Sequence, residues 1–395
     1  MRFPEFSGEW EEHTLSEYLE FKNGLNPDAK RIGSGLPFIS VMDILSEGVI
    51  NYDNIRGKVN ATEKEIECFG VKDGDLLFQR SSETLEDVGR ANVYMDNRTA
   101  IYGGFVIRGR KIGNYDPLFF KYLLATPLAR KRTCRMGAGA QHFNIGQEGL
   151  SKISLYFPSI EEQRKIAGFL SLIDERIATQ NKIIEKLQSL IKGLNDNIHK
   201  GIKGETVCFS DLGEAYSGLS GKGGDDFGYG EPFITYMNVY QNTYISEKDY
   251  ELVQIAPNEK QNSVQYGDAL FTLSSETPEE VGIGAVYLGN TQKLYLNSFC
   301  FGIHFYDERV LPQYLAHFIS SSSFRRAIYP LAQGSTRFNL QKKDFMKMKF
   351  LLPSLEKQGH IANTLDALHC RLANEKSLTE QYILLKKYLL SLMFI

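Results

Sequence analysis

Two stretches of the chain concentrate basic side chains and contain no acidic residue. Lysine and arginine side chains neutralise nucleic-acid phosphates, so local patches of this kind favour phosphate contact. The alternative is a solvated helix face, which is less favoured because the patch recurs, although the net charge of −3 argues against a uniformly basic surface. The basic residues are Lys121, Arg130, Lys131, Arg132 and Arg135 in residues 117–147, and Arg309, Arg325, Arg326, Arg337, Lys342 and Lys343 in residues 309–343.

Each basic stretch leads into a turn made of small and polar residues. Small residues let the backbone approach a ligand closely, and Gln, His, Arg and Asn side chains supply donors that can contact base edges. The two segments are Gly137-Ala-Gly-Ala-Gln-His-Phe-Asn144 and Gln333-Gly-Ser-Thr-Arg-Phe-Asn339. We therefore expect both turns to belong to a binding surface.

Motifs for catalysis are missing from the sequence. Gly221-Lys-Gly-Gly224 lacks the spacing and the following Ser or Thr of a phosphate-binding loop. The seven histidines are dispersed, and the five cysteines form no CxxC pair. Neither a signal peptide nor an apolar run of membrane-spanning length is present. We expect a reduced, cytoplasmic protein that has no catalytic residues, binds no cofactor or metal and does not contact a membrane.

The candidate residues lie in a sequence unit that occurs twice. Residues 74–94 and 267–287 are identical at thirteen of twenty-one positions. Further matches follow at a spacing of 195, including Pro158-Ser-Ile-Glu-Glu-Gln163 with Pro353-Ser-Leu-Glu-Lys-Gln358. A unit of about 195 residues is far longer than a solenoid repeat and long enough to fold as a domain. Two like domains suggest two like sites on one target.

Each copy divides into a mixed part and a helical part, which predicts an α+β fold. Strands are expected over residues 36–42, 75–78 and 104–108, where short apolar runs are bounded by turn residues. One helix is expected over residues 117–132 and another over 312–328, because Pro suits the first helical turn. The predicted domains are 1–157 and 204–352, and the predicted long helices are 158–203 and 353–395.

Each long helix carries an apolar stripe with alternating steps of four and three, which is typical of a coiled coil. We expect the two helices to pair with each other, antiparallel and related by a pseudo-twofold axis; the alternative is that each packs on its own domain. The stripe of the second helix is expected to shift phase at Leu378 and to continue through Leu385. The pairing residues are Ile166, Leu170, Ile173, Ile177, Ile184, Leu187, Ile191, Leu194, Leu365, Leu368, Leu372, Tyr382 and Leu389.

This organisation resembles the specificity (S, or HsdS) subunit of type I restriction-modification enzymes. The opening Arg2-Phe-Pro-Glu-Phe-x-Gly-x-Trp10 and the Pro-Ser-x-Glu-x-Gln motif before each long helix are similar to that family, as is the Gly334-Ser-Thr336 loop. The second copy departs from the pattern, because Gly359-His360 stands where the first copy has the more usual Arg164-Lys165. The resemblance covers the whole chain.

The resemblance implies a non-catalytic subunit that binds double-stranded DNA. Its two β-rich domains would be target-recognition domains, each reading one half of a split, asymmetric sequence. The paired helices would set the spacer and dock two methyltransferase (M) subunits, which bind S-adenosylmethionine and methylate adenine N6. Restriction (R) subunits driven by ATP, with Mg²⁺, would join the same assembly.

Comparison of the two copies sorts the candidate DNA-binding residues. Residues that differ at matched loop positions, such as Arg90 against Ile283, are candidates for reading different bases. Shared residues, such as the Ser-Ser pairs, are candidates for scaffold or phosphate contact; simple drift of loop positions is the alternative for any one residue. The candidates are Gln79, Arg80, Ser81, Ser82, Arg90, Arg130, Lys131, Arg132, Arg135, Gln141, His142, Asn144, Thr272, Ser274, Ser275, Arg325, Arg326, Gln333, Ser335, Thr336, Arg337 and Asn339.

A different class of protein, a coiled-coil adaptor or scaffold without direct DNA readout, is the rival interpretation. It would explain the two long helices but would leave the two acid-free basic stretches without a role. Salt-dependent DNA binding would distinguish the two classes, because phosphate contacts release counterions.

Overall fold

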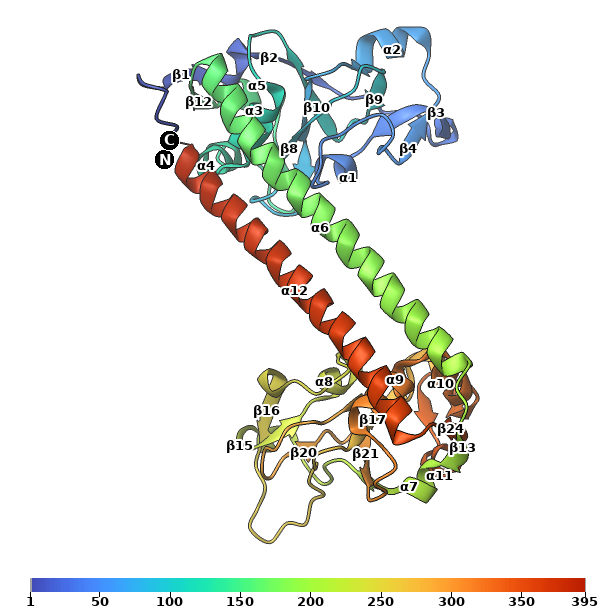
Figure 1. Cartoon of the computed structure of the whole chain (residues 1–395). Helices are drawn as coiled ribbons and strands as arrows, with labels where there is room; N and C mark the ends of the chain where they lie inside the picture. The colour runs from blue at the N-terminus through green and yellow to red at the C-terminus, as the bar shows by residue number, and fades with distance from the viewer. Residues whose placement is uncertain (1, 395) are drawn as a thin grey trace. The chain divides into compact units, whose positions relative to one another are not determined.

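The computed structural model describes residues 2–394, and the chain divides into two compact units. Unit 1 comprises residues 1–181 and 377–395, and unit 2 comprises residues 182–376. Each unit contains one β-rich domain, part of the long helix that follows that domain, and part of the other long helix (Figure 1). The two units are described separately below.

The domain of unit 1 is built on two four-stranded sheets. The first is antiparallel, in the order β2 (Leu19–Asn23), β10 (Val106–Lys111), β6 (Leu76–Gln79) and β8 (Ala91–Val93). The second has the order β4 (Gly57–Val59), β3 (Ile32–Ile39), β9 (Ala100–Tyr102) and β5 (Gly70–Val71), with one parallel pair, β3 with β9. All four residues of β6 are buried, as expected for a central strand covered on both faces.

Unit 2 repeats this plan with a smaller second sheet. The antiparallel sheet has the order β14 (Gly213–Ser217), β21 (Cys300–Phe305), β17 (Ala269–Thr272) and β19 (Gly284–Val286). The second sheet has three strands, β16 (Tyr250–Val253), β15 (Phe227–Ile234) and β20 (Tyr295–Leu296). The α+β fold predicted from the repeat is thus observed in both units.

A two-stranded pair closes each domain directly before its long helix begins. In unit 1, β1 (Glu11–Thr14) pairs with β12 (Ser154–Phe157), and α6 (Ile160–Lys200) follows. In unit 2, β13 (Glu205–Cys208) pairs with β24 (Lys349–Leu352), and α12 (Leu355–Met393) follows. The first and last segments of each domain therefore meet where the helix starts.

Several of the predicted elements have different bounds in the structure. The strand expected over residues 36–42 ends at Ile39, because the Asp43 carboxylate accepts the Ser40 N–H at 2.7 Å and caps the short helix α1 (Val41–Ile44). The helix expected over residues 117–132 is two helices, α3 (Pro117–Ala125) and α4 (Pro127–Cys134). Thr126 lies between them as an N-cap: its hydroxyl accepts the Ala129 N–H at 3.3 Å, and Pro127 cannot continue α3.

The same break occurs in unit 2, where the helix expected over residues 312–328 is also two helices. They are α9 (Pro312–Ser320) and α10 (Ser322–Ile328), and Ser321 caps the second through the Phe324 N–H at 3.3 Å. Capping side chains at matched positions 126 and 321 therefore end the first helix in each copy.

Burial along α6 follows the predicted stripe. Ile166, Leu170, Ile173 and Ile177 are buried, as are Gln180 and Ile191, whereas Ile184, Leu187 and Leu194 are partly buried. Within unit 1, α6 and α12 contact each other. The Asp174 carboxylate forms an ion pair with Lys386 at 2.5 Å, and the Arg176 guanidinium lies 5.8 Å from the Tyr382 ring centre.

The predicted phase shift in α12 is wrong. Leu385 is 43% exposed, whereas Thr379 is 6% exposed and Leu389 5%. The inward positions continue in steps of three and four from Leu372 through the partly buried Glu375, then Thr379, Tyr382, Lys386 and Leu389. Polar residues occupy inward positions of the stripe here, so a pattern that counts only apolar residues loses its phase.

Candidate nucleic-acid interface

A two-residue strand brings the shared Ser-Ser pair next to the turn-rich segment in each domain. In unit 1, β7 (Ser81–Ser82) pairs with β11 (Phe143–Asn144). In unit 2, β18 (Ser274–Ser275) pairs with β23 (Phe338–Leu340), which also pairs with β22 (Ala332–Gln333). The structure therefore joins candidates that lie about sixty residues apart in the sequence.

The turn-rich segments have the same backbone geometry in both domains. Gly139 has φ +145° and Gly334 has φ +146°, and a Cβ at either position would overlap a carbonyl oxygen, that of His142 or that of Arg337. Glycine is therefore required at both positions. The turns present their side chains to solvent; the exposed candidates are Gln141, His142, Asn144, Gln333, Ser335, Thr336, Arg337 and Asn339.

Arg130 and Arg325 hold the protein's own backbone, which gives both guanidinium groups a structural role within their domains. Arg130 Nη2 donates to the carbonyl oxygens of Glu86 at 2.9 Å and Val88 at 2.6 Å. At the matched position, Arg325 donates to the carbonyls of Glu279 and Gly282, both at 2.6 Å, and of Val281 at 2.7 Å. Burial lowers the pKa of both guanidinium groups.

Arg132 is also engaged within its domain. Its Nη1 forms an ion pair with the Glu12 carboxylate at 2.8 Å and donates to the Ser154 hydroxyl at 3.0 Å, which ties α4 to the β1–β12 pair. The expectation that Arg132 contacts phosphate is therefore not supported by its position. Three other basic candidates, Lys131, Arg135 and Arg326, are exposed.

Gln79 and Thr272, the matched candidates at the ends of β6 and β17, are buried. Gln79 is 5% exposed and donates its amide Nε2–H to the Ser81 carbonyl at 2.9 Å, whereas Thr272 is fully buried. Neither side chain is presented to solvent, so their positions in this structure do not support the expectation that they contact a base edge.

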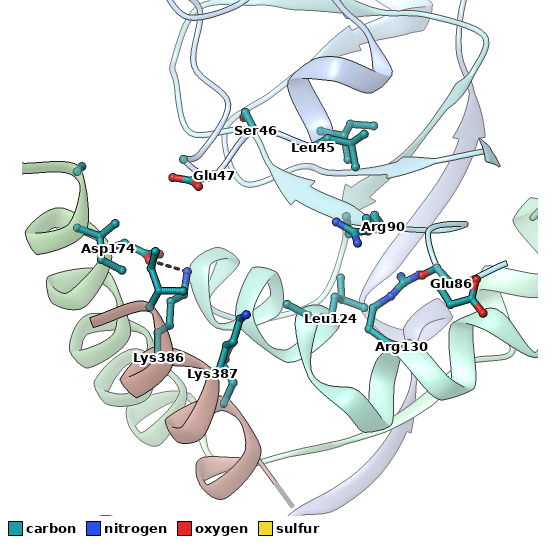
Figure 2. A pocket seen from close by; sticks show the side chains of 18 residues that line it. Leu45, Ser46, Glu47, Glu86, Arg90, Leu124, Arg130, Asp174, Lys386 and Lys387 are labelled. Atoms are coloured by element: carbon teal, nitrogen blue, oxygen red, sulfur yellow. Dashed lines mark hydrogen bonds and ion pairs between the residues drawn. The ribbon is translucent and has the colours of Figure 1, made fainter. Parts of the chain in front are cut away.

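Arg80 and Arg90 occupy different surroundings. The half-buried Arg80 donates to the Gly104 carbonyl at 3.3 Å. Arg90 is 53% exposed and forms an ion pair with Asp87 at 2.6 Å. Figure 2 shows Arg90 on the opposite side of a groove from Lys387 of α12.

This groove has a volume of about 620 Å³ and lies between the domain of unit 1 and the helices of the same unit. The Asp174–Lys386 ion pair lies on its helical side (Figure 2). A groove of about 280 Å³ in unit 2 is lined mostly by residues 195 positions away from residues of the first groove, such as His369 for Asp174 and Lys192 for Lys387. The repeat thus extends to the surfaces beside the helices.

Sequence reasoning missed two pairs of exposed apolar residues at matched positions of the two domains. Phe105 is 69% exposed and Phe299 is 55% exposed at matched positions, and the matched Met42 and Met237 are 70% and 48% exposed. The signal was present in the repeat itself, but the comparison of the copies considered mainly polar residues. An apolar side chain on the surface of one domain needs no explanation, whereas its recurrence does.

Within residues 2–394, no cluster of His, Cys, Asp and Glu side chains could hold a metal ion. In that same range no helix is long and apolar enough to cross a membrane. All five cysteines are free thiols.

Comparison with known proteins gives one consistent result. The family model described as "Type I restriction modification DNA specificity domain" matches residues 7–189 and again 204–381. The specificity subunit of the type I restriction enzyme MjaVIII from Methanocaldococcus jannaschii is 22% identical over 423 residues, covering 100% of this chain and 93% of the relative. The EcoKI specificity subunit of Escherichia coli is 24% identical over 194 residues, covering 48% of this chain and 41% of the relative.

Solved structures share the fold. The S subunit of the type I restriction-modification system from M. genitalium has a TM-score of 0.56 at 13% identity, covering 98% of this chain and 96% of that one. A chain from a study of complex assembly in a type I R-M system has a TM-score of 0.61 at 14% identity, with 97% of both chains covered.

Proposed function

Because the chain belongs to the family of type I restriction-modification specificity subunits, we propose that it reads a bipartite, asymmetric DNA sequence and catalyses no reaction itself. One observation carries this proposal. Each domain presents the same Ser-Ser strand and glycine turn, but exposes different side chains at matched turn positions, Gln141 and His142 against Thr336 and Arg337.

Shared geometry with different side chains suits two readers of different half-sites. An arginine such as Arg337 can donate two hydrogen bonds to a guanine, and a glutamine such as Gln141 can pair with adenine. The exposed Lys131, Arg135 and Arg326 would supply phosphate contacts, which position a domain without specifying sequence. Half-sites of different sequence would make the complete site asymmetric.

The long helices would pair as an antiparallel coiled coil that sets the distance between the half-sites. The same helices would dock two M subunits, which supply S-adenosylmethionine and methylate adenine N6; R subunits using ATP and Mg²⁺ would join them. Exposed apolar side chains on the helices support a protein partner, because Leu172 and Leu384 are each 63% exposed and Tyr388 is 61% exposed.

Selection from random duplex DNA tests this proposal. The full chain, assembled with its M subunits, should enrich one sequence made of two fixed halves separated by a constant number of unspecified base pairs. Its affinity should fall steeply as salt rises. Recovery of a single continuous motif, or of no motif at all, would contradict the proposal.

A further inference from the structure

Phe105 and Phe299 each occupy the third position of a tight turn that the backbone fixes in the same way. The Val106 N–H donates to the Gly103 carbonyl at 2.9 Å, and the Cys300 N–H donates to the Asn297 carbonyl at 3.0 Å. Both are the bond between first and fourth residues that defines a β-turn.

The residue just before each Ser-Ser pair also forms a hydrogen bond to this turn. The carbonyl of Phe105 accepts the Arg80 N–H at 2.9 Å, and the carbonyl of Phe299 accepts the Leu273 N–H at 2.8 Å. In unit 2 the Asn297 side chain also accepts the Phe299 N–H at 2.9 Å. These backbone hydrogen bonds fix the turn that carries each exposed phenylalanine. Because the turn is ordered before DNA binds, binding through the phenylalanine side chain loses less conformational entropy.

In unit 2 the exposed ring lies among the candidate DNA-binding residues. Phe299 and Met237 line a groove of about 410 Å³ together with Ser274, Ser275 and Arg337. Tyr236, on α8 (Tyr236–Gln241), donates its hydroxyl to the Ser274 carbonyl at 2.9 Å and so joins α8 to this edge. Apolar and polar side chains thus face the same space.

Recurrence by itself does not assign a role, because Ile112 and Tyr306 are also exposed at matched positions, at 60% and 66%. These two residues lie beyond the opposite ends of the same strands, β10 and β21, away from the Ser-Ser pairs. Of the two ends of β10 and β21, only the end that follows Phe105 or Phe299 adjoins the candidate DNA-binding residues. Ile112 and Tyr306 are therefore controls matched for exposure, strand and copy.

We propose that Phe105 and Phe299 are specificity-determining residues, each contacting the apolar C5 edge of a pyrimidine, chiefly the thymine methyl group, in its half-site. This inference rests on the proposed function and adds to it an apolar contact with a DNA base. In the major groove, thymine alone offers a methyl group, and phenylalanine can contact it directly. The neighbouring Arg337 or His142 would then contact a polar base edge beside it.

The test uses the full chain assembled with its M subunits and the duplex recovered by selection. Each thymine of that duplex is replaced in turn by uracil, which differs only by the loss of the methyl group. For the wild type, one replacement in the half-site read by unit 2 should weaken binding about fourfold, the value of one buried methyl group. For Phe299→Ala that replacement should have no effect, whereas Tyr306→Ala should behave as the wild type does.

Phe299→Leu keeps an apolar contact, so part of the affinity loss on replacing thymine by uracil should return. Phe105→Ala should abolish that affinity loss only in the half-site read by unit 1. An unchanged uracil profile in Phe299→Ala, with the wild type binding its site normally, would overturn this inference and leave the proposed function standing. If the wild type selected no sequence, both would fall.

Discussion

The neighbouring residues Arg325 and Arg326 allow a direct test of how the basic stretch divides its roles. Both lie in α10, but the Arg325 guanidinium donates to three backbone carbonyls of residues 279–282, whereas Arg326 is exposed. Arg325→Ala should therefore destabilise unit 2, and Arg326→Ala should leave its stability unchanged and weaken DNA binding.

The magnitude follows from the bonds that are lost. A hydrogen bond to a charged donor contributes about 1.5–3 kcal/mol, and a buried carbonyl left without a donor adds a further cost. Three such bonds are not additive, because water can reach part of the emptied space. We expect Arg325→Ala to lower the free energy of unfolding of unit 2 by about 2–4 kcal/mol, against less than about 0.5 kcal/mol for Arg326→Ala.

Hydrogen exchange is the suitable assay, because it reports protection segment by segment, whereas the single tryptophan, Trp10, lies in the core of unit 1 and reports on that unit. In Arg325→Ala, amide protection should fall first in residues 277–283. In the matched variant Arg130→Ala, amide protection should fall in residues 84–89. The change in Trp10 fluorescence on unfolding should then occur at a lower urea concentration than in the wild type. Equal protection in Arg325→Ala and Arg326→Ala would refute the structural role assigned to Arg325.

Three further predictions concern loop geometry, protonation and helix length. Gly334→Ala should weaken binding to one half-site at least tenfold without unfolding the domain, because a Cβ there would overlap the Arg337 carbonyl; selection with the variant complex measures it. Burial lowers the pKa of Lys121 to about 8, so the unfolded chain binds more protons between pH 8 and 10.5 and stability should rise with pH. Lys121→Met should raise the melting temperature at pH 7 and lose that advantage near pH 10.5, as thermal unfolding across pH would reveal. Matched seven-residue insertions near Gln180 and Glu375 keep the stripe in phase and add about 10 Å, comparable to three base pairs, so methylation mapping should find a longer spacer.

The repeat predicted the two domains and the glycine turns, because residues required by backbone geometry recur at fixed spacing, whereas the strands at the Ser-Ser pairs were not predicted. It did not reveal the structural role of Arg130 and Arg325, since their hydrogen-bond acceptors are backbone carbonyls, which carry no sequence signal. Burial of Gln79 and Thr272 was equally hidden, because a polar side chain at the end of a strand gives no sequence signal of being buried. The phase of α12 was lost for a related reason, because polar residues such as Thr379 lie inside the stripe.

The central claim is that each β-rich domain specifies one half of the DNA site. The most direct measurement exchanges residues 204–352 for the corresponding domain of another family member and maps methylated sequences in cells that carry the complete system. The account predicts that one half of the methylated site changes, while the other half and the spacer stay as they were. A change in both halves, or in neither half with an active complex, would contradict it.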